Sequence, residues 1–189
     1  MAYVGLRKIF VAKWNKGDTY GEKLSLGKAI GITVTPSYAE GSLYADDGQA
    51  EYDKEFSYAD VTFNTSTLPI KAHEMMFGHE TEGETGVSFK GDDQAEFVGA
   101  AWISVEKVDG TRKYIGNFLT KVKFGEPSED YATKGESIEY KTPSISGRAS
   151  TNDAGLWKMT EICATEGEAL SWIDQKFGVA AQASEAQEE

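Results

Sequence analysis

Residues 97–124, FVGAAWISVEKVDGTRKYIGNFLTKVKF, contain the strongest fold signal in this chain of 189 residues. Two runs rich in β-branched and aromatic residues, 97–108 and 111–124, flank the dipeptide Asp109-Gly110. Asp-Gly suits the positive φ angles of a type I′ turn, which joins antiparallel strands. The stretch therefore predicts a β-hairpin.

Alternating patterns predict further strands on both sides of this hairpin. Residues 29–35 and 56–65 each alternate apolar side chains with small or polar ones, as half-buried strands do. We expect Pro36 to end the first of these strands, since proline cannot donate to a sheet ladder. The two strands would pair as a hairpin with one apolar and one small-polar face. Downstream, strands are expected over residues 137–147 and 156–164.

Two short helices complete the predicted elements. Residues 68–77 form one, with Thr67 as its cap, the following glycine as its stop, and a core face of Ala72, Met75 and Met76. Thr165 and Glu168 form a capping box for the second helix, which Gly178 ends. Strands with few helices indicate a mainly-β fold, a β-sandwich or barrel with one or two short α-helices packed outside and long loops between the strands.

Three segments do not follow these patterns. Residues 1–28, interrupted by two glycines, are expected to form an N-terminal arm of a single domain that covers residues 1–178. Residues 179–189 are expected to be an acidic flexible tail. Residues 36–55, rich in Gly, Asp and Tyr, are expected to form a long loop. Such loops are usually functional or disordered, so this one either folds back on its own domain or docks on another subunit.

Composition narrows the partners and the compartment. The chain has 31 acidic and 19 basic residues and a net charge of -12, which disfavours specific binding of nucleic acid, since that needs clustered Lys and Arg. The single cysteine allows no intrachain disulfide and fits a reducing compartment. No apolar stretch is long enough to span a membrane. We expect a protein made in the cytoplasm, with no membrane partner.

Candidate reactive residues do not combine into an active site. His73 and His79 are six positions apart, which does not suit ligands on one helix face, so no metal site is expected. Cys163 follows the apolar pattern of its strand and is expected to be buried. Asp46 and Asp47 lack the spacing of a calcium loop. We therefore expect no enzyme activity, no catalytic residue and no cofactor.

Five short strings, taken in order and spacing, resemble a known family. They are KAI at 28–30 with TP at 35–36, LYADD at 43–47, RKY at 112–114, FGEPS at 124–128, and ATKGESIEY at 132–140 with TP at 142–143. They resemble the phi13-type major tail proteins, the tail-tube subunits of long-tailed siphophages. The resemblance extends over about residues 4–177, and the string at 132–140 is its most specific part.

The resemblance implies a structural virion protein without catalytic residues. Subunits of this family have a tail-tube-type β-sandwich and assemble as hexameric rings that stack into a hollow tube, through which DNA passes without specific binding. The implied partners are further copies of the chain and the tape-measure, baseplate and terminator proteins. The implied location is the phage tail, after synthesis in the cytoplasm of the host bacterium.

Two groups of residues are the candidate sites in such a tube. The small-polar alternation predicts that the lumen is lined by Gly31, Thr33, Thr35, Asp60, Thr62 and Asn64. The loop over residues 36–55, by its length and its aromatic residues, is expected to contact the next ring. Its candidate contact residues are Tyr38, Leu43, Tyr44, Asp46, Asp47 and Tyr52.

Two alternatives stay open. The chain could be a monomeric β-sandwich that binds a small ligand or carbohydrate, with Trp102, Trp157 and Trp172 as an aromatic platform. It could also be another ring-forming tail component, a terminator or baseplate protein, which would form single rings.

Overall fold

The computed structural model describes residues 2–45, 48–83, 85–108, 110–129, 133 and 142–179. The strands are β1 (Ala2–Asn15), β2 (Thr19–Tyr20), β3 (Leu24–Ser25), β4 (Ala29–Ala45), β5 (Gly48–Thr65), β6 (Glu80–Glu82), β7 (Gly86–Ser88), β8 (Phe97–Val108), β9 (Thr111–Phe124), β10 (Ser144–Ser150) and β11 (Lys158–Cys163). The helices are α1 (Ile70–Ala72), the π-helical turn η1 (His73–Phe77) and α2 (Glu166–Phe177). The predicted mainly-β fold with short helices is confirmed.

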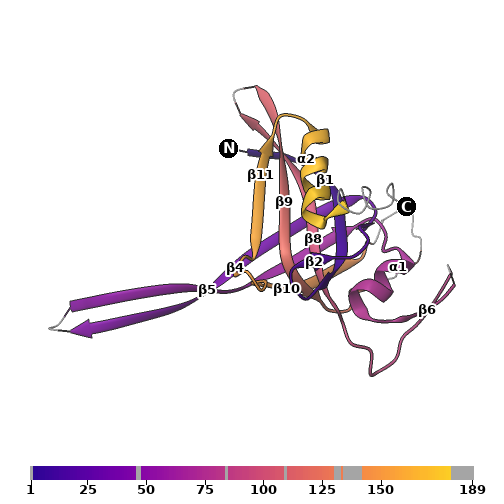
Figure 1. Cartoon of the computed structure of the whole chain (residues 1–189), viewed down its shortest axis with the longest axis horizontal. Coiled ribbons are helices and arrows are strands. Elements are labelled where there is room, and N and C mark those ends of the chain that lie inside the picture. Colours follow the sequence, from indigo (N-terminus) through magenta and orange to yellow (C-terminus); the bar gives the residue numbers. More distant parts are fainter. Residues whose placement is uncertain are drawn as a thin grey trace.

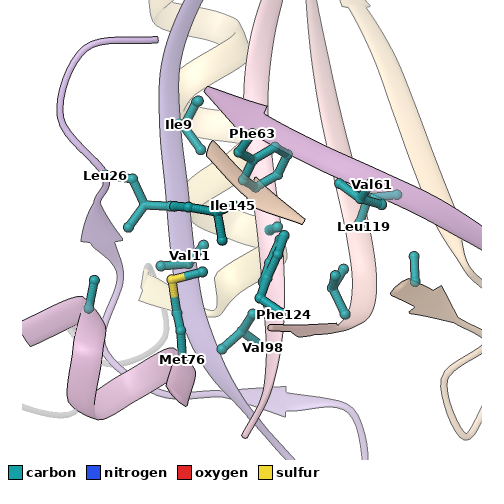
Figure 2. Packing of buried hydrophobic residues seen from close by; sticks show 14 of the residues in the cluster. Ile9, Val11, Leu26, Val61, Phe63, Met76, Val98, Leu119, Phe124 and Ile145 are labelled. Carbon is teal, nitrogen blue, oxygen red and sulfur yellow. The ribbon is translucent and has the colours of Figure 1, made fainter. Parts of the chain in front are cut away.

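Within the described residues, the main sheet has nine antiparallel strands, in the order β2-β1-β8-β9-β10-β5-β4, with β3 paired to β1 and β11 paired to β9. Strands β6 and β7 form a separate hairpin. The sheet curls so that β5 and β10 pack across β1, β8 and β9 (Figure 1). Figure 2 shows the resulting core. Strands β1, β8 and β9 contribute Ile9, Val98 and Leu119, and strands β5 and β10 contribute Val61, Phe63 and Ile145.

The central hairpin forms as predicted. β8 and β9 begin and end at the expected residues, and Gly110, with φ of 81°, takes the left-handed conformation that the turn requires. Asp109 lies outside the described residues. The later strands are shifted from their predicted bounds. β10 extends to Ser150, and of the predicted strand over 137–147 the first five residues lie outside the described part of the chain.

Residues 1–28 do not form the predicted N-terminal arm. β1 pairs with β8, and Ile9, Val11 and Ala12 are fully buried. Two irregularities interrupt the register of β1, and Lys8, at the second, has φ of 49°. Because each bulge adds an unpaired residue, the apolar side chains do not alternate strictly along the strand. The apolar alternation that would have predicted a strand in residues 1–28 is therefore not visible in the sequence.

Helix α2 agrees with its predicted caps. The Thr165 hydroxyl accepts a hydrogen bond from the Glu168 amide at 3.2 Å, and the Glu168 carboxylate accepts one from the Thr165 amide at 3.4 Å. Gly178 ends the helix with φ of 77°. α2 covers the outer face of β1, β8 and β9 (Figure 1), where it buries Ala169, Ile173 and Phe177. Residues 180–189 of the predicted tail lie outside the described residues.

The predicted helix over residues 68–77 is instead two short turns, α1 and η1. Thr67 does not cap it, since the helix begins after Pro69, whose extended backbone occupies the N-cap position without a side-chain bond. Gly78 ends it as expected, with φ of 76°. The predicted core face is confirmed by Ala72 and Met76, which are fully buried, and by Met75, which packs on the same core.

Candidate functional site

The β4–β5 hairpin extends far beyond the core and forms what we call the arm, residues 38–45 and 48–56. Pairing runs from Ala29 with Thr65 to Ala45 with Gly48, and the outer part projects from the body of the molecule (Figure 1). The predicted strand end at Pro36 and the predicted loop over 36–55 are therefore wrong. β4 is an edge strand of the sheet, and an edge tolerates proline because its nitrogen can face away from the neighbouring strand.

The arm exposes large apolar side chains. Tyr38 is 43% exposed, Leu43 57% and Tyr52 53%. Of the other predicted contact residues, Asp46 and Asp47 lie outside the described residues, and Tyr44 is described only in its backbone. The structure thus places four of the six predicted residues on one projecting hairpin, and exposes the side chains of Tyr38, Leu43 and Tyr52.

Ionic and aromatic contacts order the arm across its two strands. Lys54 forms an ion pair of 2.6 Å with Glu40, its cross-strand partner, and its ammonium lies 4.6 Å from the centroid of the Tyr38 ring. The hydrogen bond between Glu40 and Lys54 lowers the pKa of the carboxyl and raises the pKa of the ammonium. Both groups are exposed, so the pair sets a geometry and adds little stability.

Three aromatic rings hold the arm where it leaves the body. Phe56 stacks on Trp157 with ring centroids 4.6 Å apart and an angle of 11°, and Tyr38 meets Phe56 edge-on at 6.1 Å. Trp157 is itself fixed to β9, since its carbonyl accepts a hydrogen bond from the Thr120 amide at 3.1 Å. These contacts join the root of the arm to the middle of the sheet.

The six predicted lumen residues share one face of the sheet. Gly31 pairs with Asn64, Thr33 with Thr62 and Thr35 with Asp60. The intervening residues of β5 point the opposite way, and Ala59, Val61 and Phe63 are almost completely buried. Placement of these side chains in the core would have contradicted the prediction that they lie on an open face. None of the six faces the core.

Strand β10 extends this polar face by three residues that the sequence did not identify. Asn64 pairs with Ser144, Thr62 with Ser146 and Asp60 with Arg148. The hydroxyls of Thr62 and Ser146 are 3.3 Å apart, and Arg148 donates to Asp60 at 3.3 Å. The alternation of Ser144, Ser146 and Arg148 with buried Ile145 and Ala149 is visible in the sequence. The register of β10 against β5 cannot be read from the sequence.

The two histidines lie close together at the end of the core. His79 is 3% exposed, its Nδ1 is 2.7 Å from Asp93 and its Nε2 is 2.8 Å from Glu126. The second contact is close, but among the described residues His79 Nε2 has no hydrogen-bond partner. The ring of His73 is 5.8 Å away. Among the described residues, no three His, Cys, Asp or Glu side chains are grouped as metal ligands.

The remaining candidates lie on different sides of the sheet. Cys163 is 8% exposed, as expected for a buried strand residue, and burial raises the pKa of its thiol. Trp102 belongs to the inner core and Trp172 packs with the outer cluster under α2, whereas Trp157 stacks on Phe56. The three tryptophans therefore do not form a shared aromatic platform.

No protein-family model matches the chain, and no curated protein is similar to it at a significant level. Within the described ranges, none of the helices has the length and apolar character needed to cross a membrane.

Proposed function

We propose that this chain is a tail-tube subunit of a long-tailed bacteriophage, which assembles with copies of itself into stacked rings that conduct DNA. The observation that carries the proposal is the arm. It projects from the core and presents Tyr38, Leu43 and Tyr52 to solvent. Large apolar side chains gathered on a projection favour contact with another protein surface.

The arm suits assembly because its outer part extends away from the domain while its root packs on Trp157. A two-stranded hairpin is at best marginally stable alone in water, and the aromatic contacts at the arm root and the Glu40–Lys54 pair give this one a defined direction. An arm of fixed direction can reach a neighbouring copy in a repeating way. Head-to-tail contacts that close by rotation produce rings, and contacts along the axis would stack them.

The polar face suits the lining of a channel for DNA. Its nine residues are the six predicted lumen residues with Ser144, Ser146 and Arg148. Arg148, the one cation among these nine, donates to Asp60. A surface of hydroxyl and amide groups with no unpaired cation gives phosphates little to bind. The resemblance in sequence adds the expected hexameric symmetry, the virion location, and the tape-measure, baseplate and terminator partners.

The test is negative-stain electron microscopy of the concentrated protein, together with its mass by light scattering. Hollow tubes support the proposal, single rings support a terminator or baseplate component, and a monomer under all conditions contradicts assembly by the chain alone. Deleting residues 42–48 should leave a folded protein that no longer forms tubes.

A variant with two substitutions tests the role of the arm without shortening the chain. Leu43→Ser with Tyr52→Ser should weaken assembly, because it removes apolar contact area from the arm. Ile162→Ser is the matched control, since Ile162 is 60% exposed on β11. Tubes of normal length from the arm variant would contradict the role of the arm.

A further inference from the structure

A pocket of about 500 Å³ lies beneath the edge of β4, away from the arm, and Gly31 is the one residue of the polar face among those that line it. Leu6 of β1 and Ile32 and Val34 of β4 form its apolar walls, and residues of β8, β9 and β11 form its floor. The volume falls within the range of about 300–1,000 Å³ that is typical of pockets for small molecules. A hairpin from another chain is too broad to enter such a hollow, so its shape favours a small ligand.

The floor of the pocket carries a half-buried lysine. Lys158 of β11 places its ammonium 5.9 Å from the centroid of the Trp102 ring. Burial lowers the pKa of this ammonium, and among the described residues no carboxylate pairs with it. A charged group that has lost water without gaining a partner is unfavourable, and an anion in the pocket would relieve that cost.

A neutral donor lies on the same floor. The Asn117 amide donates to the hydroxyl oxygen of Ser104 at 3.0 Å and to the carbonyl of Ile115 at 3.1 Å. Since a hydroxyl carries one hydrogen and two acceptor lone pairs, this arrangement leaves the hydrogen of Ser104 for an acceptor in the pocket. Ser104 is 9% exposed and Asn117 6%, so both are well shielded from bulk water.

We propose that this pocket binds a small monocarboxylate whose body is aromatic or branched and apolar. The carboxylate meets the Lys158 ammonium and the Ser104 hydroxyl, and the apolar body lies on Trp102 between Leu6 and Ile32. A single cation with one neutral donor suits one carboxylate, while the aliphatic walls offer few partners for the hydroxyls of a sugar. The site belongs to one chain, so this proposal does not depend on assembly into a tube.

The experiment titrates the full chain with indole-3-propionate and with its methyl ester, followed by calorimetry and by NMR shifts of the Trp102 indole N–H. The ester keeps the apolar body and removes the charge. Because a hydrogen bond between charged groups is stronger than one between neutral groups, we expect the acid, which can pair with Lys158, to bind roughly tenfold or more tightly than the ester. Lys158→Met keeps the apolar stem and should abolish this preference while the ester still binds.

Two further variants keep the test decisive. Lys176→Met is the matched control, because the Lys176 ammonium lies 5.5 Å from the Trp172 ring on α2, outside the pocket, and it should bind both probes as the original protein does. Ile30→Trp, at an exposed position of the pocket lining, should weaken both probes by narrowing the mouth. The proposal is overturned if neither probe binds at millimolar concentration, if acid and ester bind equally, or if Lys158→Met retains the preference.

Discussion

Phe56→Ala should destabilise the protein and misdirect the arm. Phe56 is half-buried, and full burial of a Phe side chain contributes about 1.5–3 kcal/mol, so about half of that is lost. Its contacts with Trp157 at 4.6 Å and Tyr38 at 6.1 Å add about 0.5–1.5 kcal/mol each. The free energy of unfolding should therefore fall by about 2–4 kcal/mol.

Urea unfolding followed by circular dichroism measures this loss, and the double variant with Trp157→Ala isolates the stacking contribution. Tyr52→Ala is the control, because Tyr52 lies further out on the arm and is 53% exposed; its effect should stay within about 0.5 kcal/mol. Phe56→Ala should also reduce tube formation under conditions where the protein is still folded. A loss no larger than that of Tyr52→Ala would refute the assignment of these rings as the anchor of the arm.

Three further predictions concern stability. Thr165→Ala should lower the free energy of unfolding by about 1 kcal/mol through loss of the capping acceptor, whereas Thr165→Ser should retain it; urea unfolding of the pair measures the difference. Gly116→Ala should cost about 1–3 kcal/mol in the same assay, because the new methyl carbon would lie 2.7 Å from the Trp172 ring. Gly41→Ala, with no atom within 4 Å of that carbon, should change stability by less than about 0.5 kcal/mol, and a loss as large as that of Gly116→Ala would contradict the steric explanation. Burial lowers the pKa of His73, so the native state binds fewer protons there than the unfolded state, and this contribution to stability is present above about pH 6.5 and lost as the pH falls through the lowered pKa. Unfolding free energy should therefore fall more steeply between about pH 7 and 5 in the original protein than in His73→Gln, and equal slopes would argue against it.

Elements specified by local chemistry were predictable from the sequence. Asp109-Gly110 places a turn by backbone conformation alone, and Thr165 with Glu168 places a helix start by two hydrogen bonds within four residues. The alternation around Val61 likewise separates a buried face from a polar one. Each signal lies within a few residues of the structure that it determines.

Features that depend on distant strands were not predictable. Pro36 suggested a strand end because the sequence does not reveal that β4 is an edge strand. The bulges of β1 hid its apolar pattern, and its burial follows from pairing with β8. The addition of Ser146 to the polar face depends on the register between β10 and β5. The pocket beneath β4 combines side chains from five strands, so no local pattern in the sequence marks it.

The central hairpin has a consequence for how the protein can change over time. β8 and β9 are covered on one face by the inner core and on the other by α2, so their amides should be the last to exchange with solvent deuterium. The buried residues of β8 and β9 leave little room for substitution without loss of the whole fold. The arm touches the body chiefly at its root, so its outer residues can diverge freely, and new partners can be acquired there while the rest of the molecule is inherited unchanged.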